Sequence, residues 1–310
     1  MSSEYWSNRY SIAESSSHSF SAIFSSFCNS KSISILGKIV CLKPVMTYKL
    51  FVVTWNCGDV PEIDLDVLLN GIGTDGADIV VLNLQEANRF KMNTREATKV
   101  VKMGQIITII ISKISREITV HKLGLGFFGY TNKGCIFTEI GDLVMCNIHL
   151  SPDEENVLMR ENQLKDILES VNSACDKIVL AGDFNFRSNF DESRNLMKMN
   201  TIKLKEGTID FDVTYKYTKG SNHIDKSRKS AYCDRIFTSE IIDINQYGSK
   251  QDENISDHKP VYLVGRVNEI SEGNKNMVDI GASNKIIAKV YENKYIAICV
   301  VVAVMLFLAK

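Results

Sequence analysis

Short apolar runs rich in β-branched residues recur between residues 46 and 267, and they constrain the fold more than any other feature of the sequence. Most are bounded by Gly, Asp or Asn, so we expect strands at residues 49–55, 78–84, 105–111, 142–150, 177–184 and 260–267. One helix is expected over residues 156–175, because its apolar spacing forms a single face through Leu164, Ile167, Leu168 and Val171. Many strands and few helices predict an α/β fold in which packed sheets are flanked by helices.

The two ends of the chain differ in composition from this strand-rich region. Residues 1–34 hold 14 serines without sustained periodicity, so residues 1–45 are predicted to be serine-rich and disordered. Residues 268–294 are mostly polar and are predicted to be a flexible linker.

Residues 295–310 are predicted to form a transmembrane helix that anchors the chain at its C-terminus. Residues 295–309 carry no charge, and as a helix they span about 22 Å, against about 30 Å of bilayer hydrocarbon. Flanking Lys294, Tyr295 and Lys310 can lie at the membrane interface and reduce this mismatch. The alternative is a buried C-terminal helix or strand, although a helix packed on a soluble core usually keeps a polar face, which this segment lacks.

Net charge and cysteine spacing exclude several kinds of site. The formal net charge of −1 gives no general basic surface for nucleic acid, so an anionic ligand needs a local basic cluster. The eight cysteines include no C-x-x-C pair and no spacing typical of a zinc site or a disulfide framework. A reducing compartment fits this cysteine usage best.

Polar residues stand at or just past the ends of five apolar runs. A carboxylate at the end of a buried strand is unfavourable unless a charged group lies beside it. Because several such groups are expected to meet at one end of a sheet, they predict a site for a hard divalent cation such as Mg²⁺. The residues are Asn56, Glu86, Asn147, His149, Asp183, Asn185, Asp257 and His258.

A second set of residues is basic. It includes Asn132 and Lys133 of "YTNKG", Tyr215, Lys216 and Lys219 of "TYKYTKG", and Lys226, Arg228, Lys229 and Arg235 near "CDRI". Taken alone, the run from Lys226 to Lys229 fits a solvated loop. Beside an anionic metal site, the same run fits a phosphate clamp.

The ordered motifs "TWN", "NLQE", "NKG", "NIHL", "GDFNFR", "EGTIDFDVTYKYTKG", "AYCDRIF" and "SDHKPV" resemble those of the inositol polyphosphate 5-phosphatases. This family lies within the magnesium-dependent endonuclease/exonuclease/phosphatase superfamily. "QE", "GDxN" and "SDH" belong to the superfamily, whereas "TYKY" and "CDRI" are more specific to the inositol branch. The resemblance implies a DNase I-like fold, a four-layer sandwich of two mostly antiparallel sheets and outer helices, with residues 46–267 as the catalytic domain.

The resemblance also implies roles for individual residues. Asp183 is expected to orient and deprotonate the attacking water, while Asn185 and His149 contact phosphate oxygens. His258 is expected to contact the scissile phosphate, with Asp234 fixing its ring. The expected Mg²⁺ ligands are Glu86, Asn56 and Asp257.

The expected substrate-binding residues are Lys133, Asn132, Tyr215, Lys216, Arg228, Lys229 and Arg235. Which of Lys226, Arg228 and Lys229 contacts the 4-phosphate stays open. The chain departs from the family pattern at Ser230 and Tyr232, where proline and tryptophan are usual, and after His149, where "LSPDE" stands and small residues and another polar group are common.

The expected reaction is Mg²⁺-dependent removal of the 5-phosphate from phosphoinositides, above all phosphatidylinositol 4,5-bisphosphate, at a membrane surface. The expected partners are the lipid headgroup and a membrane held through residues 295–310, with no nucleic acid. A single-pass C-terminal anchor would leave the catalytic domain in the cytosol, and the endoplasmic reticulum is one candidate membrane. The alternatives are another superfamily phosphodiesterase, either a sphingomyelinase or a nuclease, and a phosphoinositide-binding scaffold without strong catalysis.

Overall fold

The computed structural model describes residues 45–272 and 277–281, except positions 94, 127–128, 172, 174, 189–190 and 199–201, together with two short strands and Met305. The chain divides into two compact units, Met1–Met46 and Thr47–Lys310. In the first unit, β1 (Ile33–Ile35) pairs antiparallel with β2 (Lys38–Val40). Apart from Val45 and Met305, the rest of the predicted serine-rich segment and the predicted anchor lie outside the described residues. Where the structure describes the chain, no helix is long and apolar enough to span a membrane.

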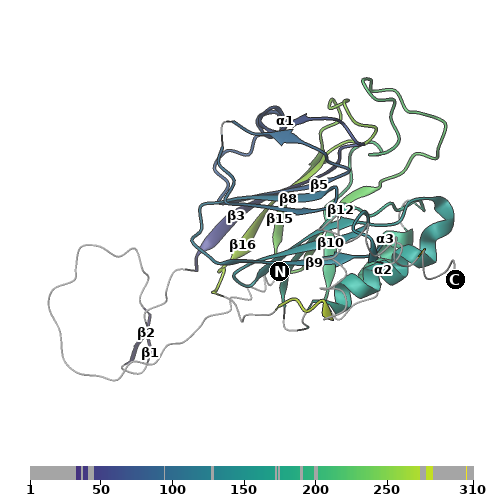
Figure 1. Ribbon diagram of the computed structural model, residues 1–310. Helices are drawn as coiled ribbons and strands as arrows, with labels where there is room; N and C mark the ends of the chain where they lie inside the picture. The colour runs from purple at the N-terminus through teal and green to yellow at the C-terminus, as the bar shows by residue number, and fades with distance from the viewer. Residues whose placement is uncertain are drawn as a thin grey trace, which may run out of the picture. The chain divides into compact units, whose positions relative to one another are not determined.

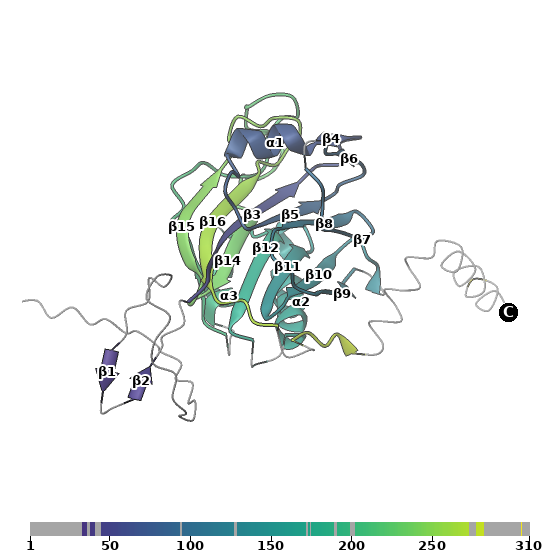
Figure 2. The same ribbon diagram turned by 90° about the vertical axis from the view of Figure 1, so that its left-hand side faces the viewer.

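Two six-stranded sheets pack face to face in the second unit (Figures 1 and 2). The first has the order β15 (Asp243–Ser249), β16 (Val261–Asn268), β3 (Thr47–Asn56), β5 (Ile79–Gln85), β8 (Ile106–Ser112) and β7 (Lys99–Met103). The second has the order β13 (Leu204–Glu206), β14 (Asp234–Ser239), β12 (Lys177–Asp183), β11 (Leu143–His149), β10 (Gly134–Ile140) and β9 (Ile118–Gly124). Neighbouring strands are antiparallel except for β3 with β5 and β11 with β12. A small parallel pair joins β4 (Ile63–Asp64) to β6 (Phe90–Lys91).

Alternating side chains of the strands create three apolar layers. Leu50 and Val52 of β3 pack between the two sheets, whereas Phe51 and Val53 face the opposite side and pack with α1 (Leu65–Ile72). The Asp64 carboxylate begins α1 by accepting hydrogen bonds from the first backbone N–H groups, which otherwise lack partners. The short η2 (Glu154–Asn156) leads into α2 (Val157–Glu169), which lies with α3 (Asp191–Lys198) on the outer face of the second sheet (Figure 2). The helix–sheet–sheet–helix arrangement confirms the expected fold class.

The six expected strands are confirmed as β3, β5, β8, β11, β12 and β16, with ends shifted by at most two residues. The expected helix over residues 156–175 is too long, because α2 ends at Glu169 and Val171 then forms a bridge with Val278. The apolar pattern does not predict α1 or α3, which are only eight residues each and gain their stability from caps and packing.

The prediction of a flexible linker from residue 268 is wrong for the part that the structure describes. Ile270 is buried between the sheets, and Met277, Val278 and Ile280 are buried against the second sheet and α2. The backbone N–H of Val278 donates to the Glu139 carboxylate at 3.2 Å. Polar composition concealed this docking, because a few apolar side chains suffice to hold a segment to a sheet. Residues 282–294 of the predicted linker lie outside the described residues.

Candidate active site

The structure brings most of the polar residues predicted to meet at one edge of the sheets together there, but Asn147 lies between the sheets and bonds Gln85 and Thr108. Parallel strands β11 and β12 end together, so that His149 pairs in register with Asp183. Asp183 in turn pairs with Asp234, the first residue of antiparallel β14. In the other sheet, parallel strands β3 and β5 end in register at Asn56 and Gln85. The ends of both sheets therefore contribute to one site.

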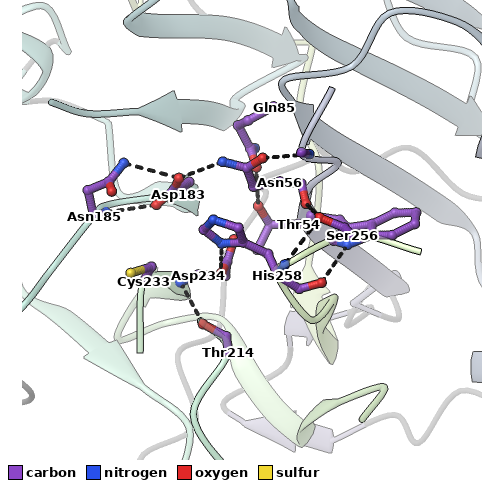
Figure 3. Close-up of polar contacts among 12 residues, drawn as sticks. Thr54, Asn56, Gln85, Asp183, Asn185, Thr214, Cys233, Asp234, Ser256 and His258 are labelled. Atoms are coloured by element: carbon purple, nitrogen blue, oxygen red, sulfur yellow. Dashed lines mark hydrogen bonds and ion pairs between the residues drawn. The ribbon is translucent and has the colours of Figure 1, made fainter. Parts of the chain in front are cut away.

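Asp183 lies at the centre of this site and is 1% exposed. Its Oδ2 accepts hydrogen bonds from the amide groups of Asn56 at 2.8 Å and Asn185 at 3.1 Å, and its Oδ1 accepts from the Asn185 backbone N–H at 2.9 Å (Figure 3). Burial alone would raise the pKa of Asp183, but the positive charges of His258 and Lys133 and the Asn56 hydrogen bond outweigh it and lower the pKa. Asp183 is therefore an ionised carboxylate held in a fixed orientation.

His258 and Asp234 form a buried pair beside Asp183. His258 Nδ1 lies 2.8 Å from Asp234 Oδ2, and Figure 3 shows the ring reaching from Asp234 toward Asp183 and Asn56. Burial opposes the charge on His258, but the carboxylates of Asp234 and Asp183 prevail and raise its pKa to about 9. Hydrogen bonds from the indole of Trp55 to the His258 carbonyl and from the His258 N–H to Ser256 fix the backbone. The site thus holds an imidazolium at neutral pH.

A second histidine behaves in the opposite way. Burial and the nearby Lys133 ammonium lower the pKa of His149 to about 3, so its ring is neutral at physiological pH. Its Nε2 then accepts from the Lys133 ammonium and lies 3.6 Å from both the Glu86 and Asp183 carboxylates. His149 therefore positions Lys133, which is the cationic member of this pair.

The residues at this edge fit a divalent cation. Ligand atoms of Asp183, Asp234 and His258 lie within 4.8 Å of one another, which is a possible metal group in the described part of the chain. Because His258 already donates to Asp234, the oxygen atoms of Asn56 and Glu86, which lie beside Asp183 and His149, are better placed to hold a cation. Carboxylate and amide oxygens suit hard cations, and the Glu86 side chain is about one-third exposed.

Two of the expected ligands are also engaged within the chain. Asn56 Oδ1 accepts from the Gly58 backbone N–H at 2.9 Å, and Asp257 Oδ1 lies 3.9 Å from the Lys219 ammonium. Glu86 has φ of 48°, a backbone conformation that non-glycine residues rarely adopt and that clusters at functional sites.

A polar cavity of about 260 Å³ lies near the reaction centre. Its lining residues are Asp153, Glu154, Glu155, Arg187, Ser227, Arg228 and Lys229. Tyr215 connects the two regions, because its ring centroid is 4.5 Å from that of His258 and 4.4 Å from the Arg187 guanidinium carbon. The structure therefore brings the basic residues Arg228 and Lys229 to the same side as Tyr215. Lys216, the next residue, forms an ion pair with Asp225 at 3.1 Å.

Asn132 and Lys133 line a different cavity, of about 680 Å³, together with Leu125, Ser151, Pro152 and residues of α2. Through Lys133, which contacts His149, this second cavity adjoins the site.

Arg235 does not belong to the site, and the prediction that it binds substrate is wrong. Side chains alternate along a strand, so the neighbour of Asp234 points away from Asp234's side of the sheet. The Arg235 side chain is fully buried and forms a two-point ion pair with Glu206, with Nε 2.5 Å from Oε1.

Sequence reasoning missed two residues of the site. Arg187 is 5% exposed, donates to Asn185 Oδ1 at 2.5 Å and lines the polar cavity. Gln85 is fully buried and donates to Asn147 Oδ1 at 2.7 Å, thereby linking the two sheets below the site. Both residues stand inside motifs already singled out, "GDFNFR" and "NLQE", and this proximity was the available signal.

Comparison with known proteins gives a match to a family model and to curated relatives. The model described as Endonuclease/Exonuclease/phosphatase family 2 matches residues 100–203 and 191–264. The phosphatidylinositol 4,5-bisphosphate 5-phosphatase INP51 of Saccharomyces cerevisiae is 30% identical over 176 residues, which cover 46% of this chain and 19% of that protein. Phosphatidylinositol 4,5-bisphosphate 5-phosphatase A of Rattus norvegicus is 25% identical over 302 residues, covering 69% of this chain and 30% of that protein. The chain thus spans less than a third of the length of these relatives.

Among solved structures, the inositol polyphosphate 5-phosphatase domain of spSynaptojanin, in complex with inositol (1,4)-bisphosphate and calcium ion, has a TM-score of 0.59 with this chain. The two are 20% identical, and the match covers 82% of this chain and 92% of that domain. This likeness shows a shared fold.

Proposed function

The chain belongs to the endonuclease/exonuclease/phosphatase family, and from this membership we propose that it removes the 5-phosphate from phosphoinositides, above all phosphatidylinositol 4,5-bisphosphate, in a Mg²⁺-dependent reaction. The observation that carries the proposal is the convergence of ionised Asp183, the His258–Asp234 pair and a polar cavity containing Arg187, Arg228 and Lys229. The names of the curated relatives and the inositol-branch motifs "TYKY" and "CDRI" support the same substrate class.

Asp183 is the residue suited to activate water. Hydrolysis of a phosphate monoester is extremely slow without a catalyst, and it requires an oriented nucleophile together with positive charge around the phosphate. Its lowered pKa keeps Asp183 ionised, and Asn56 and Asn185 hold both of its oxygens in place. A water hydrogen-bonded to this carboxylate would be oriented toward a phosphate held between Asp183 and His258.

His258 and Lys133 supply positive charge from the protein. With a pKa of about 9, His258 is protonated at neutral pH, and Asp234 occupies its Nδ1–H so that Nε2–H can donate to a phosphate oxygen. Bound Mg²⁺, held by Glu86, Asn56 and Asp257 as expected from the sequence, would neutralise charge on the phosphate oxygens.

The membrane part of the proposal rests on residues 295–310 as a C-terminal anchor, with the catalytic domain on the cytosolic side and the endoplasmic reticulum as one candidate membrane. Docking of residues 277–281 leaves 282–294 as the tether, which as a flexible chain would reach about 20 Å root-mean-square. Deleting residues 295–310 should lower activity on bilayers more than on short-chain lipid. An equal loss on both would contradict the anchor.

The central test measures phosphate release from short-chain phosphatidylinositol 4,5-bisphosphate with Mg²⁺ and with a chelator. Asp183→Asn, which keeps size and removes charge, runs alongside the parent chain. Release that needs both Mg²⁺ and Asp183 supports the phosphatase. Turnover of sphingomyelin or DNA instead would select another superfamily phosphodiesterase, and no turnover by folded protein would select a binding scaffold.

A further inference from the structure

The polar cavity is lined in part by an ion pair that a phosphate bound there would contact. Arg228 Nη1 lies 2.5 Å from Asp153 Oδ1, and both side chains are about half exposed. Arg228 comes from the loop before β14, whereas Asp153 comes from the loop after β11, so the pair joins two walls of the cavity.

The backbone of Asp153 has a strained conformation. Its backbone has φ of 75° and ψ of 152°, a region that residues with a Cβ rarely adopt. The Asp153 carbonyl accepts a hydrogen bond of 2.6 Å from Arg160, whose side chain is fully buried in α2. Because a buried side chain fixes the unusual backbone, the carboxylate of Asp153 has a set location rather than that of a freely moving surface group.

Acidic and basic residues balance each other in this cavity. Arg187, Arg228 and Lys229 face Asp153, Glu154 and Glu155, and the neighbouring Lys216 is paired with Asp225. An anion entering such a cavity finds guanidinium and ammonium groups already opposed by carboxylates, so it gains less than it would from unopposed cations.

We infer that Asp153 is a specificity-determining residue that competes with a second ring phosphate of the substrate for Arg228. The inference rests on the proposed function, because it assigns the cavity to a phosphate of the same headgroup whose 5-phosphate lies at Asp183. A headgroup without that second phosphate leaves the Asp153–Arg228 pair intact and is unaffected by it. A headgroup that carries the second phosphate must displace the Asp153 carboxylate from Arg228, which reduces its gain in affinity over a headgroup that lacks this phosphate.

The test compares the affinity of the full chain for inositol 1,4-bisphosphate and for inositol 1-phosphate by calorimetry. Asp153→Asn keeps the side-chain size and removes the charge, and it places no greater demand on the backbone than Asp153 itself. We expect it to tighten binding of the bisphosphate about two- to five-fold, the range set by an exposed ion pair, and to leave the monophosphate unchanged. The KM for short-chain phosphatidylinositol 4,5-bisphosphate should fall in parallel.

Two further variants make the comparison specific. Glu155→Gln removes the same charge from the same cavity wall without breaking the Arg228 pair, so it should give a clearly smaller gain. In an Arg228→Gln background, Asp153→Asn should give no gain at all. If Asp153→Asn does not fold, Asp153→Gly replaces it, because glycine adopts this backbone conformation without strain.

The inference is overturned if Asp153→Asn raises the affinity for both ligands equally, or if Glu155→Gln raises the bisphosphate affinity as much. It is also overturned if the increase survives in the Arg228→Gln background, or if no variant prefers the bisphosphate. If the chain hydrolyses phosphoinositides but Asp153→Asn does not selectively raise the bisphosphate affinity, only this inference is refuted. A selective gain in a chain that does not hydrolyse phosphoinositides keeps this inference and removes the phosphatase.

Discussion

Arg160 and Glu192 form a buried ion pair that ties together the two loops carrying site residues. Arg160 Nε lies 2.7 Å from Glu192 Oε2, and the two side chains are 0% and 4% exposed. Arg160 also donates to the Ser151 carbonyl in the loop after β11. Glu192 Oε1 accepts from the Arg187 backbone N–H at 2.7 Å in the loop after β12. Helices α2 and α3 thereby hold the segments that follow His149 and Asp183.

Glu192→Gln should destabilise the chain strongly, because it leaves a buried guanidinium without its counter-charge. Breaking one side of a buried ion pair costs about 3–5 kcal/mol, a large part of the roughly 5–15 kcal/mol that stabilises a typical domain. Burial opposes ionisation of Glu192, but Arg160 and two backbone N–H groups outweigh it and lower the pKa below its ordinary value of 4.5. The stabilisation is therefore complete above about pH 4.5 and is lost as the pH falls through the lowered pKa.

Equilibrium urea unfolding of the parent, Glu192→Gln, Arg160→Met and the double variant measures this effect. Once one partner is gone, removing the other adds little, so the double variant should be no less stable than the worse single variant. Asp191→Asn on the same helix is the matched control, because its partner Arg194 is exposed and the change should stay within about 0.5 kcal/mol. Additive losses in the double variant, or single losses as small as that of the control, would refute the reasoning.

Three more predictions follow from the site and its surroundings. Asp234→Asn removes the counter-charge that keeps the pKa of His258 high, so activity should fall at least about 10²-fold and the basic limb of the pH profile should move below pH 9. Gly182→Ala places a Cβ 2.0 Å from the Ile148 carbonyl oxygen, so thermal unfolding should show a loss of about 1–3 kcal/mol or more. Val278→Asp buries a charge against the second sheet, and hydrogen exchange should show the segment around it released while the two sheets stay protected.

Most of the reaction centre could be predicted because its residues stand at the ends of apolar strands, either as the last residue, like His149 and Asp183, or as the first, like Asp234. Once β11 and β12 are strands, their parallel register places His149 beside Asp183, and no long-range information is needed beyond the pairing itself. Arg235 shows the limit of this reasoning, since residues adjacent in a motif point to opposite faces of a strand. Roles that depend on a partner from a distant loop, such as Arg228 with Asp153, became visible only in three dimensions.

The docked C-terminal segment changes how a membrane anchor could serve this site. Val278 bonds to Glu139 and bridges to Val171, just past the end of α2, whereas α2 begins just after the loop that follows His149. The chain therefore leaves the sheets at the end opposite the reaction centre, and the seven residues of β11 between the two ends span about 20 Å. A tether of residues 282–294 can extend to at most about 45 Å. If the chain is anchored, the folded unit would therefore have to rotate relative to the membrane before its site could face the bilayer that holds the anchor. If residues 295–310 anchor the chain as proposed, release of residues 277–281 would lengthen the tether and ease access of the site to the membrane.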